Sequence, residues 1–212
     1  MEVKKHDIQI STKARFFTLG ELNEETEEVW FVLHGYGQLA SRFLKKFEAI
    51  DDGRRLIVAP EGLSRFYWKG FSGNVVASWM TKEDRLDDID NYVSYLDSVY
   101  DQVIGDQKIK VRLLGFSQGT ATACRWAVRG KSKIDSLIMW AGAFPEDVNY
   151  FENVEFFNKL DVKFLIGKQD QLFTKEQINA HRNMISDKGV NFKYIEFEGD
   201  HNIYEQPLRD LL

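Results

Sequence analysis

The chain has 212 residues, of which 43% are hydrophobic and 29% charged, and it carries a formal net charge of −5. This length predicts one domain over residues 1–212, with enough apolar residues to bury a core. Acidic and basic residues are interspersed, which excludes the clustered basic face of a nucleic-acid-binding protein.

The N-terminus is polar from Glu2 to His6, and no apolar run along the chain is long enough to span a membrane. The single cysteine, Cys124, has no partner for an internal disulfide, which fits a reducing compartment. We therefore expect a cytoplasmic protein without stable membrane insertion. Short basic groups such as Arg54-Arg55 are expected to be solvated, and the sequence does not predict an oligomeric state.

Short apolar runs alternate with longer amphipathic segments, a pattern typical of a mostly parallel sheet with helices on both faces. The region 6–19 alternates weakly and is expected to add antiparallel strands at one edge of this sheet. Apolar runs that predict buried strands lie at 29–33, 55–59, 110–114, 134–140, 162–166 and 192–197. Helices are predicted at 40–50, 82–104, 118–129, 175–188 and from residue 203 onward.

The stretch 61–80 lacks a clear period, although it is rich in aromatic residues. It lies between a predicted strand and the longest predicted helix, where this class of fold places loops that face the substrate. A loop of this length in a compact domain is usually functional. We therefore predict that it is a long, substrate-facing loop.

A buried strand leads directly into the sequence G-F-S-Q-G at residues 115–119, and a helix rich in small residues follows. A strand-to-helix turn of the form G-x-S-x-G holds its serine in a strained conformation that exposes the hydroxyl. The glycines are required because the neighbouring backbones pass too close for a Cβ. Since a helix N-terminus also favours negative charge, Ser117 is predicted to be a catalytic nucleophile. The alternative is a tight turn without chemistry.

A serine nucleophile needs a base and an orienting carboxylate, and the expected order along this fold is serine, acid, histidine. Of the four histidines, only His181 and His201 follow Ser117. His181 lies within a helical pattern, whereas His201 follows the last predicted strand on a loop. His201 is therefore the predicted base.

The orienting carboxylate should lie on a loop that follows a strand between the serine and the histidine. Asp170 meets this condition, three residues after Gly167 at the end of a predicted strand. Asp200 is the main rival, but side chains adjacent in sequence usually point apart, so it is poorly placed to bond the His201 ring. Asp170 is therefore the predicted acid.

A glycine-rich turn, H-G-Y-G at residues 34–37, follows the first buried strand. Such a turn lets one backbone N–H face the substrate carbonyl, and a second N–H comes from the residue after the nucleophile. The predicted oxyanion donors are the backbone amides of Tyr36 and Gln118. His34 is expected to hold the turn through its ring nitrogens and not to act as a base.

These motifs together resemble the phospholipase/carboxylesterase group of α/β-hydrolases, which includes the acyl-protein thioesterases. They occur in the expected order over nearly the whole chain, as H-G-Y-G, G-F-S-Q-G, Gly167 with Asp170, and His201, with Trp79 before the long helix as in the family. The resemblance implies an α/β-hydrolase fold with little or no cap domain. It also implies hydrolysis of short- to medium-chain carboxylic esters or thioesters without a cofactor.

The predicted mechanism is acyl transfer from a small-molecule ester or thioester through an acyl-enzyme. The sequence has no metal-ligand spacing, P-loop or dinucleotide motif, so neither a metal nor a cofactor is expected. Two alternatives stay open: a peptidase or amidase with the same triad, and a non-catalytic binding module that keeps the fold. Large apolar side chains near the predicted site are candidate walls of an acyl pocket, namely Trp68, Phe71, Trp79, Met80, Phe144 and Phe173.

Overall fold

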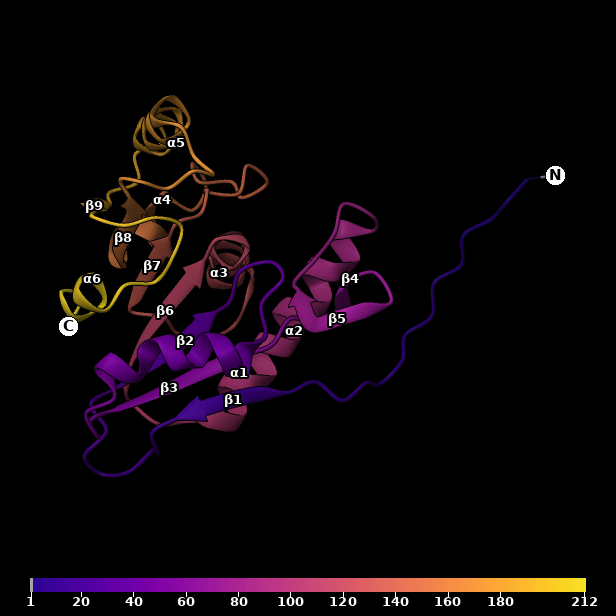
Figure 1. Cartoon of the computed structure of the whole chain (residues 1–212), viewed down its shortest axis with the longest axis horizontal. Coiled ribbons are helices and arrows are strands. Elements are labelled where there is room, and N and C mark those ends of the chain that lie inside the picture. The colour runs from indigo at the N-terminus through magenta and orange to yellow at the C-terminus, as the bar shows by residue number, and fades with distance from the viewer. Residues whose placement is uncertain (1) are drawn as a thin grey trace.

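The structure is a computed structural model that describes residues 2–212, and a seven-stranded sheet forms its centre (Figure 1). The strands are β1 (Phe16–Leu19), β2 (Glu28–Leu33), β3 (Arg55–Pro60), β6 (Lys110–Phe116), β7 (Ser136–Trp140), β8 (Asp161–Gly167) and β9 (Lys193–Phe197). Their order in the sheet is β1-β3-β2-β6-β7-β8-β9. All neighbours are parallel except β1, which pairs antiparallel with β3 at the edge, as predicted for the N-terminal region.

Helices cover both faces of the sheet and enclose two apolar cores. One face carries α2 (Arg85–Val103), α3 (Gln118–Arg129), α4 (Val154–Lys159) and α5 (Lys175–Asp187). The other carries α1 (Ala40–Phe43), the 3₁₀ helix η1 (Leu44–Ile50) and α6 (Glu205–Arg209). This architecture confirms the predicted α/β-hydrolase fold. Within residues 2–212, none of the helices combines the length and the apolar character needed to cross a membrane.

The predicted long loop at 61–80 is wrong. Two antiparallel strands, β4 (Ser64–Lys69) and β5 (Ser72–Ser78), form a separate hairpin there, which projects beside the main sheet (Figure 1). Most of β4 and the first half of β5 are exposed, so no alternation between a buried and a solvated face marks them as strands. Helix α4 was also not predicted, because six residues are too few to show a helical period.

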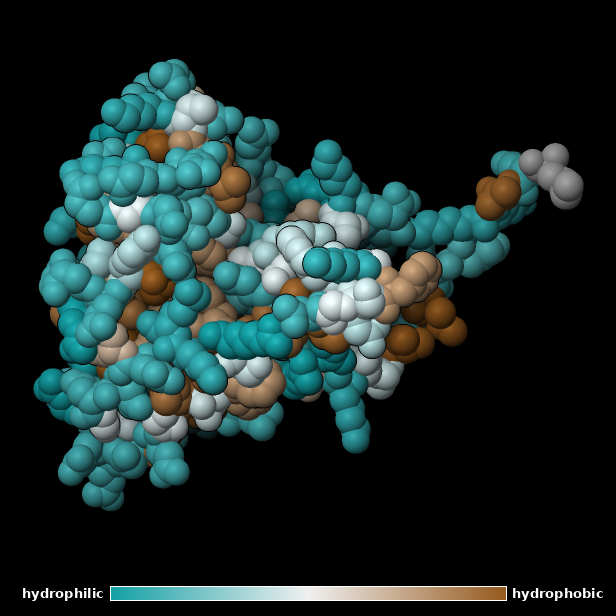
Figure 2. All heavy atoms as spheres, viewed as in Figure 1, coloured by the Kyte–Doolittle hydropathy of each residue, from teal (hydrophilic) through white to brown (hydrophobic). Residues whose placement is uncertain are grey.

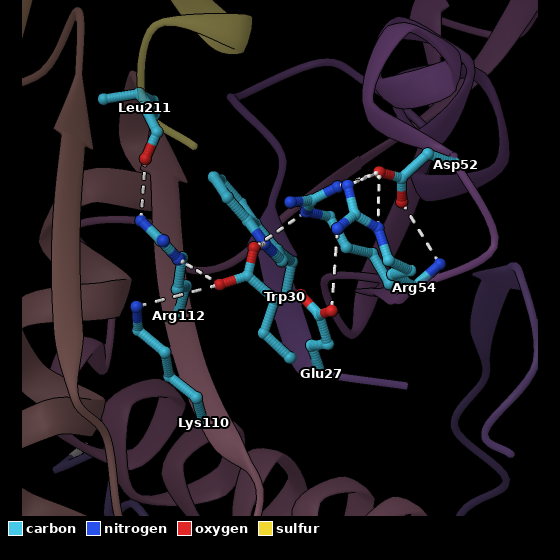
Figure 3. Close-up of polar contacts among 9 residues, drawn as sticks. Glu27, Trp30, Asp52, Arg54, Lys110, Arg112 and Leu211 are labelled. Carbon is cyan, nitrogen blue, oxygen red and sulfur yellow. Dashed lines mark hydrogen bonds and ion pairs between the residues drawn. The ribbon is translucent and has the colours of Figure 1, made fainter. Parts of the chain in front are cut away.

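A buried ionic cluster lies at the amino ends of the central strands (Figure 3). The Glu28 carboxylate accepts hydrogen bonds from Arg55 at 2.8 Å, from Arg112 at 2.6 Å and from the indole of Trp30 at 2.9 Å. Arg112 also donates to the carbonyl oxygen of Leu211 at 2.8 Å. The cluster therefore ties β2, β3, β6 and the C-terminal residues together. Arg55 is buried, so the prediction that Arg54 and Arg55 are both solvated is wrong for Arg55.

Candidate active site

Ser117 occupies the tight turn between β6 and α3, with φ 54° and ψ −117°. A non-glycine residue in this region is strained by about 1–3 kcal/mol, a cost that recurs at functional sites. A Cβ at Gly115 would collide with the backbone of Gly119, and a Cβ at Gly119 would collide with the carbonyl oxygen of Leu33. The two glycines therefore let the turn pack directly against β2, with the serine at its apex.

The structure brings His201 and Asp170 together. His201 Nδ1 lies 2.8 Å from Asp170 Oδ2, and the other carboxylate oxygen accepts the backbone N–H of Leu172 at 2.9 Å. The Asp170 side chain is only 1% exposed. A proton on Nδ1 satisfies this contact and leaves Nε2 free to accept a proton, which is the tautomer that a general base requires.

Two loops hold this pair in place. The backbone N–H groups of Lys168 and Gln169 donate to the carbonyl oxygens of Phe197 and Gly199, both at 2.9 Å. The side-chain oxygen of Gln169 accepts the N–H of Gly199 at 2.5 Å. The loop after β8, which carries Asp170, is thus hydrogen-bonded to the loop after β9, which carries His201.

His201 also lies against the turn that contains Ser117. Its ring centroid is 5.0 Å from that of Phe116, the residue before Ser117, and 6.4 Å from that of Phe173. The contact with Phe116 was not predicted from the sequence, where x in G-x-S-x-G carries no assigned role. The rival carboxylate, Asp200, is engaged elsewhere, since its Oδ1 accepts the hydroxyl of Tyr204 at 3.0 Å.

The predicted oxyanion turn lies beside Ser117. A Cβ added to Gly35 would stand 3.1 Å from the Cβ of Ser117, a tight approach that a glycine relieves. The side-chain oxygen of Gln38 accepts the N–H of Gly35 at 2.9 Å. This contact was not predicted from the sequence. The turn that contains Tyr36 therefore lies next to Ser117, and Gln118 is the residue that follows Ser117.

His34 is fully buried beneath this turn and uses both ring nitrogens. Its Nε2 accepts the N–H of Gly62 at 2.9 Å, and its Nδ1 donates to the carbonyl oxygen of Gly35 at 2.8 Å. The ring stacks on Trp79 at a centroid distance of 5.0 Å. Burial lowers the pKa of His34 to about 4, so the ring is neutral at neutral pH.

Acid is expected to destabilise the fold through His34. Between the ordinary histidine pKa of 6.5 and the folded pKa of about 4, the unfolded chain binds a proton that the folded chain excludes. The free energy of unfolding should therefore fall as the pH decreases through this window, by up to about 3 kcal/mol. Urea unfolding between pH 7 and pH 4 measures this slope.

The variant His34→Gln cannot titrate, and its amide oxygen can still accept the N–H of Gly62. It should show a shallower pH slope than the wild type. An unaltered slope in His34→Gln would show that His34 does not carry the effect.

The predicted pocket walls separate into core and surface residues. Trp79 and Phe144 are each 1% exposed and are enclosed by core side chains, so neither offers a surface to a substrate. Phe71 is 102% exposed at the tip of the hairpin. Trp68 lies over Gly37, where an added Cβ would collide with its indole ring.

The remaining two predicted walls are only partly buried. Met80 packs against the core, and its sulfur lies 3.3 Å from Nη1 of Arg125. Phe173 lines a cavity of about 370 Å³ together with Asp170 and Ile178. Trp68 thus lies beside the ring of Tyr36, and Phe173 lies beside Asp170 and His201.

The hairpin and the oxyanion turn share an exposed aromatic surface. Tyr36, Tyr67 and Trp68 are each about half exposed, and the Tyr36 ring lies 5.9 Å from that of Trp68. In Figure 2 the face shown is largely teal, and pale and brown side chains gather over the hairpin and the adjoining N-terminal segment. An apolar surface therefore borders the candidate site on the hairpin side.

Comparisons with known proteins bear on the family and the fold of this chain. A family model described as "Serine hydrolase (FSH1)" matches residues 26–206, which include every motif above. Among curated protein sequences, none matches the chain significantly.

Several solved structures share the fold. The esterase PE8 is 19% identical with a TM-score of 0.69, over 94% of this chain and 96% of that chain. Zea mays acyl-protein thioesterase 2 is 14% identical with a TM-score of 0.70, over the same shares of the two chains. The Bacillus cereus carboxylesterase is 11% identical with a TM-score of 0.65, over 93% and 91%. From the family match and the shared fold, the chain belongs to the FSH1 family of serine hydrolases.

Proposed function

We propose that this serine hydrolase cleaves small-molecule carboxylic esters or thioesters of short to medium acyl chains, through an acyl-enzyme on Ser117. The observation that carries the proposal is the 2.8 Å contact between His201 and the buried Asp170, on loops that meet beside the strained serine turn. The names of the similar structures, an esterase, a carboxylesterase and an acyl-protein thioesterase, support ester or thioester substrates over amides.

The reaction proceeds in two steps. His201 Nε2 takes the proton of Ser117 as the hydroxyl attacks the carbonyl carbon, and the backbone amides of Tyr36 and Gln118 stabilise the oxyanion. His201 then gives this proton to the leaving alcohol or thiol. Water, deprotonated by the same ring, hydrolyses the acyl-enzyme and regenerates the serine. Asp170 keeps the Nδ1 proton in place and stabilises the imidazolium that forms.

A fluorophosphonate probe and a substrate panel test this function. We expect one probe molecule to attach to each chain at Ser117. The wild type should hydrolyse p-nitrophenyl esters and acyl thioesters, with a rate that depends on chain length, and should act poorly on peptide anilides. Ser117→Ala should lose both labelling and hydrolysis, and Ser98→Ala, an exposed serine on α2, should retain both.

The contrary results are distinct for each alternative. Faster cleavage of anilides than of esters would identify a peptidase or amidase with the same triad. Absence of labelling in the folded wild type would identify a non-catalytic binding module. Normal hydrolysis by Ser117→Ala would exclude Ser117 as the nucleophile.

A further inference from the structure

The Gln118 side chain is bonded to a segment far away in the sequence. Its Oε1 accepts the backbone N–H of Trp79 at 3.1 Å. Its Nε2 donates to the carbonyl oxygen of Met80 at 3.0 Å and to the hydroxyl of Ser78 at 3.1 Å. The residue that supplies one predicted oxyanion amide is thus tied by its own side chain to the end of β5.

The same segment holds the other predicted oxyanion donor. The indole N–H of Trp79 donates to the carbonyl oxygen of His34 at 2.8 Å. The N–H of Gly37 donates to the carbonyl oxygen of Ala77, and the N–H of Ala77 donates to the carbonyl oxygen of Gln38, both at 3.0 Å. The turn that contains Tyr36 is therefore bonded on both sides to residues 77–80.

Such a tie is required because the central sheet does not reach the donors. The pairing of β2 with β6 ends at Leu33 opposite Gly115, and the donor residues Tyr36 and Gln118 each lie three positions further along. Past this point no strand ladder fixes their separation. Ala77, Ser78 and Trp79 are almost completely buried, so the segment that bonds both donor residues is itself held in the core.

We propose that residues 77–80 form a brace that sets the spacing of the two oxyanion amides, with the Gln118 side chain and the Trp79 indole as positioning residues. The proposal rests on the proposed function, because it assigns a role to the oxyanion site of that reaction. Oxyanion donors must lie about 2.7–3.1 Å from the developing charge, and a displacement of about 1 Å can reduce the rate about 100-fold. The brace therefore acts on the transition state and only weakly on substrate binding.

Gln118→Met tests the brace, because it removes the side-chain hydrogen bonds and keeps the side-chain length and the backbone amide. We expect kcat for a p-nitrophenyl ester to fall about 10- to 100-fold, with KM within about threefold of the wild type. Labelling by the fluorophosphonate should slow by a similar factor, since its phosphoryl oxygen occupies the oxyanion position.

A second variant adds a signature that a merely structural role would not produce. In Gln118→Glu, an ionised carboxylate would face the Met80 carbonyl oxygen, whereas a protonated carboxyl group can donate to it as the amide does. The ratio of variant to wild-type kcat should therefore rise as the pH is lowered from 8 to 5.

Thr122→Val is the matched control for helix α3. Its hydroxyl donates to the carbonyl oxygen of Gln118 at 3.4 Å, and Thr122 is buried but takes no part in the brace contacts described above. This variant should keep kcat within about twofold of the wild type. An equal loss of kcat in Thr122→Val and Gln118→Met would show that the loss comes from a less stable helix α3, and would overturn the proposal.

Two further results separate this inference from the proposed function. If the wild type hydrolyses esters, a Gln118→Met variant with wild-type kcat would overturn the brace alone. A ratio of Gln118→Glu kcat to wild-type kcat that does not change with pH would do the same. Absence of Ser117-dependent hydrolysis in the wild type would overturn the proposed function and the brace together.

Discussion

Replacing Asp170 with asparagine is expected to lower kcat for a p-nitrophenyl ester by about 10⁴-fold without unfolding the protein. One carboxylate oxygen of Asp170 accepts the N–H of Leu172, so the oxygen of an asparagine must occupy that place. Its NH₂ group then faces His201 Nδ1, which it can only bond when Nδ1 is unprotonated. The proton moves to Nε2, and the ring can no longer accept the proton of Ser117.

Asp200→Asn is the matched control, because it changes the neighbouring carboxylate on the same loop. Asp200 bonds the hydroxyl of Tyr204, so this variant should keep most of the activity. Both variants are compared by kcat, KM and thermal midpoint. A larger loss in Asp200→Asn than in Asp170→Asn would reverse the assignment of the acid.

The predicted site residues could be proposed from the sequence because each follows a strand in a parallel sheet. The carboxyl ends of such strands meet at one edge, so chain order and loop position were enough to select Asp170 and His201. The strand that precedes Ser117 could be recognised because all its residues after Lys110 are buried and, apart from Arg112, apolar.

The hairpin and the contacts of Gln118 could not be predicted in this way. Strands β4 and β5 are largely solvated, so they lack the apolar alternation that marks a half-buried strand. The partners of the Gln118 amide are mainly backbone groups about 40 positions earlier in the chain, and any residue type can supply them. Local sequence patterns carry no information on such contacts.

The ionic cluster shows a similar limit. Arg55 is adjacent to Arg54, and in sequence the two appear equivalent, yet only Arg55 faces the carboxylate of Glu28 inside the protein. Arg55 is the first residue of the buried strand β3 and pairs with Glu28 in the sheet, whereas Arg54 precedes the strand. The partner of Arg55 comes from another strand, so the pair becomes visible only once the register of β2 and β3 is known.

Glu28→Gln is expected to lower the free energy of unfolding by about 3–5 kcal/mol, because it removes the negative charge that joins Arg55 and Arg112. The buried guanidinium of Arg112 loses its carboxylate partner, whereas Arg55 keeps its ion pair with Asp52. Burial alone would raise the pKa of Glu28, but hydrogen bonds from Trp30, Arg55 and Arg112 outweigh it and lower the pKa, so the carboxylate is ionised at neutral pH. Urea unfolding at pH 7 measures the loss.

Glu27→Gln is the control for this effect, since the neighbouring carboxylate pairs with Arg54 at 3.5 Å on the exposed surface. Its effect should stay below about 1 kcal/mol and should diminish in high salt, because water and ions already screen that pair. The loss of stability in Glu28→Gln should persist in high salt, since the guanidinium group of Arg112 that loses its partner is buried. Equal losses in the two variants would mean that the cluster at the base of the sheet stabilises the fold no more than a surface ion pair does.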